Sequence, residues 1–296
     1  MANFNLVFNT LRSFLAAKGG EIMPTHCRTE IPFSLLQVMF FFLTWAGCWL
    51  PVAVMCAIAI AWRPHKPLTT EQKLPLLASL YLIVPFVIER FRGVVGASFS
   101  DYGFAWNLGI LRSLGLGFGL GVLSLMVCFG IQTSLGWVTW HSKNWRRLVS
   151  VLLPTLLLAF WIGGTEELVF RGFLITQLQQ DYAAGVAAVI SSLIFALLHL
   201  IWERRETIPQ LPGLWLMGVV LVLARWIDGG SLGLAWGLHT GWVWAIASLD
   251  SLQIITYPGI GSEWVTGKNG KPLAGAAGIF CLLATGGILW LFAEYY

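Results

Sequence analysis

The amino-acid sequence predicts an all-α protein, a polytopic transmembrane helix bundle of about eight spans. Of its 296 residues, 57% are hydrophobic and only 11% are charged, whereas about a quarter of the residues in soluble domains are charged. The mean hydropathy is +0.75. Several uncharged stretches approach or exceed the roughly 20 apolar residues that a helix needs to cross a bilayer. Residues 31–296 are therefore expected to form one multi-pass domain in the plasma membrane or an internal membrane, with the lipid bilayer as a partner.

The charges and the cysteines argue against two other classes of protein. The net charge is only +4, and the basic residues are scattered rather than gathered in a stripe, so no nucleic-acid partner is expected. The five cysteines are odd in number and form no CxxC pair. They indicate small core residues rather than a disulfide framework or a zinc knuckle.

The N-terminal segment, residues 1–30, precedes the first uncharged stretch. It carries Arg12, Lys18 and Arg28 and lacks the uncharged core and cleavage site of a removed signal peptide. Its apolar residues recur at spacings of three and four, which is typical of an amphipathic helix in the headgroup region. A frayed polar terminus is the alternative.

The first half of the membrane domain contains three apolar stretches. Residues 31–62 include no charge, which suits one long or tilted helix with a kink at Pro51. Residues 74–88 are fewer and either cross the bilayer or only enter it. Residues 113–140 contain glycines at GxxxG spacing, which allows close helix approach; the pairs are Gly115 with Gly119 and Gly117 with Gly121. A nucleotide-binding loop is a poor alternative, because no strand precedes these glycines and no GK[ST] sequence follows.

The second half contains five more uncharged stretches, each eighteen to twenty-two residues long. They are residues 148–165, 183–202, 207–224, 229–249 and 272–293. Together with the first half, they predict spans at about residues 34–62, 74–88, 115–138, 148–170, 183–202, 207–224, 231–249 and 273–293.

Three charges directly follow the eighteen uncharged residues 148–165. A carboxylate near bilayer depth costs about 2.5 kcal/mol or more, so it is kept only when it faces the protein interior or a wet cavity. Glu167 and Arg171 are i and i+4 on a helix, in the favourable order, so Arg171 holds Glu167 ionised. Glu166 points about 100° away round the helix and stays free. We therefore expect Glu167 to have a structural role and Glu166 to take part in the chemistry of the site.

His199 and His239 lie on two further spans and complete the set of intramembrane polar residues. Alone, each histidine is more often a helix-helix hydrogen-bonding residue, and a Glu-Arg pair is often a structural lock. Together the residues predict one buried polar site inside the bundle. A desolvated carboxylate can take a proton from water near neutral pH while one imidazole positions the water and another stabilises an oxyanion. That chemistry is peptide hydrolysis without a covalent step.

Other hydrolytic sites find less support in the sequence. HExxH and GxSxG are both absent, which argues against a zincin helix and a nucleophile elbow. The aspartate pair of an intramembrane aspartyl protease is missing, because Asp228 and Asp250 lie at the ends of spans. A serine protease using Ser191 or Ser192 with His239 as its base stays open.

Three motifs resemble those of a known family. Glu166-Glu167-x-x-x-Arg171 is similar to EExxxR, residues 195–199 are similar to FxxxH, and His239 fits the histidine of HxxxN or HxxxD. In this order on three apolar helices, they resemble the CPBP family of intramembrane proteases. That family includes type II CAAX prenyl endopeptidases, bacteriocin-processing proteins and abortive-infection proteins. The resemblance covers roughly residues 100–250.

The resemblance implies an intramembrane endopeptidase whose substrate is a membrane-associated peptide or protein, prenylated or leader-bearing. Glu166 would be the general base acting with His199, and His239 would face the oxyanion. The supporting residues would be Glu167, Arg171 and Phe195. A zinc ion held by Glu166, His199 and His239, with an open fourth position, is the alternative. We favour the metal-free mechanism, because it gives every residue a role.

Position 243 departs from the family pattern. The family commonly has Asn or Asp four residues after the third-motif histidine, and this chain has Val243. Loss of one oxyanion donor typically lowers the rate by about 100-fold to 1000-fold. The nearest polar residues, Thr240 and Trp242, lie at other helical angles. A catalytically silent membrane scaffold or assembly factor is therefore the main alternative, and a proton-coupled transporter ranks below it because no inverted repeat is evident.

Overall fold

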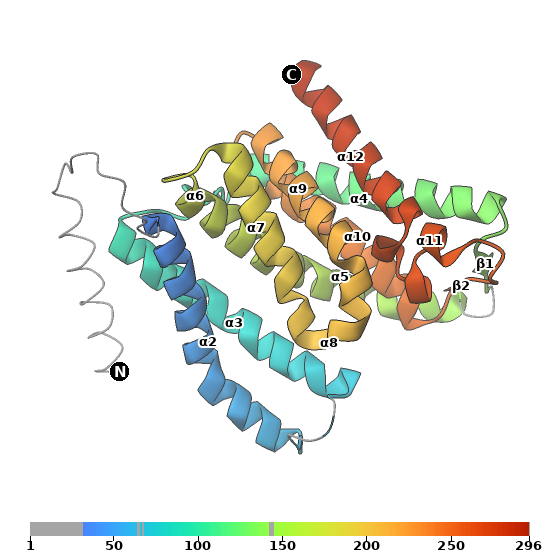
Figure 1. Cartoon of the computed structure of the whole chain (residues 1–296), viewed down its shortest axis with the longest axis horizontal. Coiled ribbons are helices and arrows are strands. Elements are labelled where there is room, and N and C mark those ends of the chain that lie inside the picture. Colours follow the sequence, from blue (N-terminus) through green and yellow to red (C-terminus); the bar gives the residue numbers. More distant parts are fainter. Residues whose placement is uncertain (1–31, 64–65, 67, 142–144, 296) are drawn as a thin grey trace.

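The computed structural model of the protein describes residues 32–63, 66, 68–141 and 145–295. The expected N-terminal segment, residues 1–30, lies outside these ranges. The described part is a bundle of long helices (Figure 1). It contains one two-stranded antiparallel sheet, β1 (Thr139–Trp140) with β2 (Ile255–Thr256), which pairs Thr139 with Thr256.

The helices follow one another with short connections. The long ones are α2 (Phe33–Ala59), α3 (Thr70–Val95), α4 (Leu108–Ser134), α5 (Trp145–Glu166), α7 (Ala184–Leu198), α9 (Leu211–Ile227), α10 (Gly233–Ser251) and α12 (Ala276–Tyr295). A π-helix (Glu167–Leu174) and α6 (Ile175–Leu178) continue α5. Short helices α8 (Leu200–Thr207) and α11 (Glu263–Thr266), and 3-10 turns at Ile208–Gln210, Lys268–Gly270 and Pro272–Ala274, fill the connections.

Six of the described helical segments are long and apolar enough to cross a membrane. They are Phe33–Ala59, Glu71–Val95, Leu108–Ser134, Arg147–Leu178, Leu200–Ile227 and Ala276–Glu294. The chain is thus a multi-pass membrane protein. The expected number of about eight is not reproduced, because Ala184–Leu198 is a shorter apolar helix and α10 is not among the six. Much of α10 is buried, including His239, so it lies against other helices rather than against lipid.

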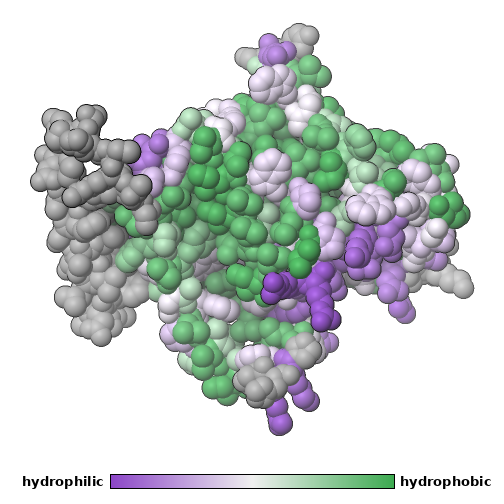
Figure 2. All heavy atoms as spheres, viewed as in Figure 1, coloured by the Kyte–Doolittle hydropathy of each residue, from purple (hydrophilic) through white to green (hydrophobic). Residues whose placement is uncertain are grey.

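The surface agrees with a bilayer environment. Large hydrophobic side chains are exposed along several helices, with Ile58 at 74%, Phe86 at 73% and Met55 at 71%. Hydrophobic residues cover much of the face in Figure 2, and hydrophilic residues are gathered in patches. Exposure of such an apolar surface to water is unfavourable, so these side chains are expected to contact lipid or another protein.

The α2 and α3 helices pack against each other and against the π-helix. Phe173 of the π-helix lies with its ring centroid 4.4 Å from that of Phe41 on α2 and 5.7 Å from that of Phe91 on α3. All three rings are buried. This aromatic contact seats α3 beside the helix that carries Glu166 and Glu167.

Glycines bring α4 and α10 into close contact. A Cβ at Gly117 would lie 2.2 Å from Leu234 O, and one at Gly237 would lie 2.0 Å from Leu114 O, so neither position admits a larger residue. The close approach expected from the GxxxG spacing is therefore present at Gly117, whereas Gly115 has no atom within 4 Å of such a Cβ. This close packing fixes the position of α10, which carries His239, against α4.

Candidate active site

The first motif lies where an α-helix changes into a π-helix. Glu166 is the last residue of α5, and Glu167 and Arg171 belong to the π-helix that follows. A π-helix bonds residue i to i+5, so its turn is wider than the α-helical turn that the sequence predicted here; such segments occur frequently at functional sites. All eight residues of the π-helix are buried.

Arg225 of α9 supplies hydrogen bonds where the π-helix ends. Its Nη1 donates to Arg171 O and, at 3.5 Å, to Gly172 O. Its Nη2 lies 3.2 Å from Thr176 Oγ1. Arg225 is only 6% exposed. Because carbonyls at such a helical transition lack part of their regular partners, this guanidinium stabilises the segment that carries the motif.

Glu167 links the motif helix to His239. Arg171 Nη1 donates to Glu167 Oε1 at 3.0 Å, and both side chains are fully buried, so the predicted i,i+4 pair is present. His239 Nδ1 lies 2.7 Å from the same oxygen. An ionised carboxylate only accepts hydrogen bonds, so Nδ1 carries a proton, and in the neutral form of the ring Nε2 presents a lone pair.

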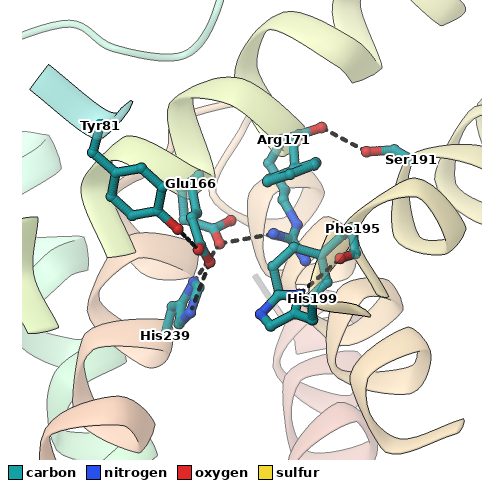
Figure 3. A network of polar contacts seen from close by, with 9 residues as sticks. Tyr81, Glu166, Arg171, Ser191, Phe195, His199 and His239 are labelled. Carbon is teal, nitrogen blue, oxygen red and sulfur yellow. Dashed lines mark hydrogen bonds and ion pairs between the residues drawn. The ribbon is translucent and has the colours of Figure 1, made fainter. Parts of the chain in front are cut away.

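Glu166 has a different set of neighbours (Figure 3). The hydroxyl of Tyr81 on α3 donates to Glu166 Oε1. Glu166 Oε2 lies 3.6 Å from His239 Nε2. Glu166 as a whole residue is 7% exposed. His239 therefore stands between the two carboxylates, with one ring nitrogen toward each.

His199 lines the same cavity as Glu166 but makes no direct hydrogen bond or ion pair with it among the described residues. Its Nδ1 is 2.8 Å from Phe195 O, which only accepts, so Nε2 is left as the free ring nitrogen. In the described part of the chain, no carboxylate oxygen lies within 4 Å of His199, and the imidazole beside Glu166 is that of His239. The reason is local: α7 ends at His199, and the ring turns back onto the last turn of its own helix.

The phenylalanine of the second motif packs among the polar residues. The Arg171 guanidinium carbon lies 4.3 Å from the centroid of the Phe195 ring, a cation-π distance. The same ring lies 4.7 Å from the His199 ring and 6.1 Å from the His239 ring, in edge contacts. Phe195 thus contacts Arg171 and both histidines of the site.

The two serines of the serine-protease alternative do not contact His239. Ser191 Oγ donates to Phe170 O at 2.7 Å and so holds the π-helix against α7. Ser192 Oγ is buried and has no hydrogen-bond partner among the residues described. Neither hydroxyl has a base beside it.

A cavity of about 480 Å³ opens beside Glu166. Tyr81, Glu166 and His199 provide polar atoms in its wall, and Lys73, paired with Glu203 of α8, stands at another part of it. Its other lining residues are mostly aromatic and aliphatic, among them Phe42, Trp45, Trp49, Leu77, Leu80 and Trp202. Such a chamber accepts an apolar segment next to a carboxylate.

A second cavity, of about 350 Å³, reaches the site from the other side. His199, His239 and Val243 line it, and so does Asp250 near the end of α10. His199 lines both cavities. Because Val243 offers no donor here, the side-chain hydrogen bond that Asn or Asp would provide at this position is lacking.

The three possible zinc ligands are not gathered around one point in the described part of the chain. In His239 and His199, Nδ1 is taken up by Glu167 and by Phe195 O, so only Nε2 of each ring is open to an ion. In the described ranges, no group of three His, Cys, Asp or Glu side chains is placed to hold a metal. We therefore derive no step through a metal ion.

The sequence of this region matches a family model. Residues 146–245 match the model described as type II CAAX prenyl endopeptidase Rce1-like. This region, about a third of the chain, is similar to the CPBP family and is called the CPBP region. The match confirms the resemblance stated from the motifs, and the family is one of proteases. No curated protein and no solved structure matches the chain.

Two residues of the site escaped the sequence analysis. Tyr81 lies outside the CPBP region, and a single tyrosine in an apolar helix forms no motif. The one pattern in the sequence that includes it is the i, i+4, i+8 spacing with Lys73 and Leu77, which places the three on one helix face. All three residues line the cavity. Arg225 had a clearer signal, because it directly follows the uncharged residues 207–224, just as Glu166 follows an uncharged stretch.

Proposed function

We propose that the protein is an intramembrane endopeptidase that hydrolyses a peptide bond in a membrane-associated substrate, prenylated or leader-bearing. The observation that carries the proposal is the position of the Glu166 carboxylate. Glu166 belongs to the CPBP region and lines an apolar cavity, and its Oε2 lies 3.6 Å from His239 Nε2. A buried acid and an imidazole at this separation suit activation of a water molecule.

The first step follows from the hydrogen-bonding state of His239. With its proton on Nδ1, Nε2 and the ionised Glu166 are both acceptors, so they form no direct hydrogen bond, and a water that donates one hydrogen to each suits the gap. Glu166 takes a proton from this water while the water oxygen bonds to the carbonyl carbon. The proton then passes to the leaving nitrogen as the carbon-nitrogen bond breaks.

His199 is proposed to face the developing oxyanion. Its Nδ1 proton is directed to Phe195 O, which leaves Nε2 free, and the residue lines both cavities. When protonated, Nε2 can donate to the oxyanion, which is the role the resemblance had given to His239. Glu167 and Arg171 hold His239 in the tautomer and orientation that the water requires.

The proposed mechanism uses no metal ion, and this is open to a direct test. Purified active protein is expected to carry less than a stoichiometric amount of zinc and to keep its rate in the presence of a membrane-permeant chelator. A three-ligand zinc site would lose its activity on chelation, because the ion would activate the water. Metal analysis and the rate of peptide cleavage before and after chelation measure both quantities; one zinc per chain with chelator-reversible activity would contradict the assignment to Glu166.

The second candidate function is a catalytically silent membrane scaffold, and Val243 is the observation that favours it. If the protein is an enzyme that lacks one oxyanion donor, Val243→Asn is expected to raise kcat by up to about 100-fold. Val243→Ala, which makes room without adding a donor, is the control. Cleavage of a fluorescence-quenched prenylated CAAX peptide by protein in proteoliposomes measures both. An unchanged rate in Val243→Asn would remove Val243 as the reason for slow turnover.

The enzyme and the scaffold also differ in a cell. Deletion of the gene followed by expression of Glu166→Ala restores the normal phenotype only if the protein acts as a scaffold. Failure of that variant, with rescue by the wild type at the same protein level, supports the peptidase.

A further inference from the structure

Tyr81 reaches Glu166 from outside the CPBP region. Its hydroxyl donates to Glu166 Oε1, across 85 positions in the sequence. Tyr81 is 8% exposed, and its ring meets the edge of Trp161 with centroids 6.2 Å apart. The side chain is therefore held between α3 and α5 and points at the carboxylate, as Figure 3 shows.

This contact restricts a torsion that is otherwise loose. The last side-chain torsion of glutamate is broad and roughly two-fold, so a carboxylate without a donor samples many orientations. In this protein Tyr81 holds Oε1, and that leaves Oε2 directed at His239 Nε2, 3.6 Å away. A hydrogen bond to an ionised carboxylate is among the stronger ones in proteins.

The other parts of the site give Glu166 no comparable support. Arg171 is occupied with Glu167, and His239 donates from Nδ1 to Glu167 rather than to Glu166. Among the hydrogen bonds of the described residues, Tyr81 is the donor to the Glu166 side chain. Tyr81 and Glu166 both line the larger cavity, where a substrate would sit.

We propose that Tyr81 is a positioning residue for Glu166, and that its hydroxyl determines which carboxylate oxygen takes the proton from water. The proposal rests on the proposed peptidase function and adds a residue of α3 to its machinery. Because α3 is seated on the π-helix through Phe91 and Phe173, the same packing that builds the bundle also sets the orientation of the carboxylate.

Tyr81→Phe tests the proposal, because it removes the hydroxyl and keeps the ring. With the fluorescence-quenched prenylated CAAX peptide in proteoliposomes, kcat is expected to fall about 10-fold to 100-fold while KM is unchanged, as for loss of one hydrogen bond to a charged group. Tyr102→Phe is the matched control, since Tyr102 is also buried but packs on Phe173. The control is expected to keep the wild-type kcat.

A double-mutant comparison separates positioning from general loss of structure. In the Glu166→Gln background, Tyr81→Phe is expected to cause no further loss, because its effect runs through Glu166. An equal loss in both backgrounds, or a Tyr81→Phe kcat equal to that of Tyr102→Phe, overturns the proposal.

Different results would show that the positioning role of Tyr81 is wrong and that the proposed peptidase function is wrong. If Glu166→Gln is inactive and Tyr81→Phe is fully active, only the positioning role is wrong. If the wild type cleaves no peptide, both are wrong.

The thermal unfolding midpoints of the two single variants and the double variant report the hydrogen bond without any substrate. Non-additive shifts of the midpoint show that Tyr81 and Glu166 interact, and additive shifts contradict the contact on which the inference depends.

Discussion

Replacement of Glu166 by glutamine is expected to lower the rate of peptide hydrolysis by about 100-fold to 10,000-fold, which is the contribution of a general base. Glutamine has nearly the same shape as glutamate, but its amide cannot accept a proton at neutral pH. Among the described residues, Tyr81 and His239 contact the Glu166 carboxylate and no Arg or Lys pairs with it, so its neutralisation strands no guanidinium or ammonium group. The thermal unfolding midpoint in detergent is expected to stay close to that of the wild type.

The rate and the unfolding midpoint must be measured on the same preparation. Glu263→Gln is the matched control, because it makes the same change at an exposed position of α11. A Glu166→Gln protein that unfolds, or one that turns over at the control rate, would contradict the role assigned to this carboxylate.

Glu167→Gln is expected to destabilise the protein by about 3 to 5 kcal/mol, the usual cost of removing one partner of a buried ion pair. Arg171 is fully buried, and its Nε and Nη2 have no hydrogen-bond partner among the described residues. Loss of the Glu167 charge leaves the guanidinium with little besides the Phe195 ring, 4.3 Å away. His239 loses the carboxylate that orients it, so activity is expected to fall as well.

Arg171→Gln is expected to resemble Glu167→Gln, since it leaves the carboxylate as the unpaired charge. The double variant should be less unstable than the sum of the two single variants, because residues in direct contact are not additive. Thermal unfolding of the three proteins in one detergent measures this. A stable but inactive Glu167→Gln protein, together with an unfolded Glu166→Gln protein, would show that the two glutamates have the opposite roles.

Much of the architecture follows from simple patterns in the sequence. Charge-free stretches identify the helices, because a charge at bilayer depth is costly and therefore rare. The same rule identifies Glu166, Glu167 and Arg171 as exceptions that need a purpose. The i,i+4 spacing of Glu167 and Arg171 correctly predicts their ion pair, and the order of the three motifs predicts the family.

The remaining features depend on tertiary contacts that no local pattern records. The π-helix requires Arg225 from another helix to satisfy carbonyl oxygens, and an i,i+4 pattern suits both helical forms. Which histidine meets Glu166 depends on where α7 ends, because His199 turns back to Phe195 O. Tyr81 comes from a helix whose placement depends on aromatic packing. The expected count of about eight spans is not confirmed, because among the described residues six helical segments are long and apolar enough to cross a membrane, α7 is shorter, and much of α10 is buried.

The most direct test of the account is a product analysis with purified protein in proteoliposomes. A panel of membrane-associated peptides, prenylated CAAX peptides among them, is incubated with the wild type and with Glu166→Gln, and mass spectrometry identifies the fragments. We expect the wild type to cut one internal peptide bond of at least one substrate and Glu166→Gln to leave that substrate intact. Fragments formed equally by both proteins, or no fragments from any peptide with a correctly folded wild type, would contradict it.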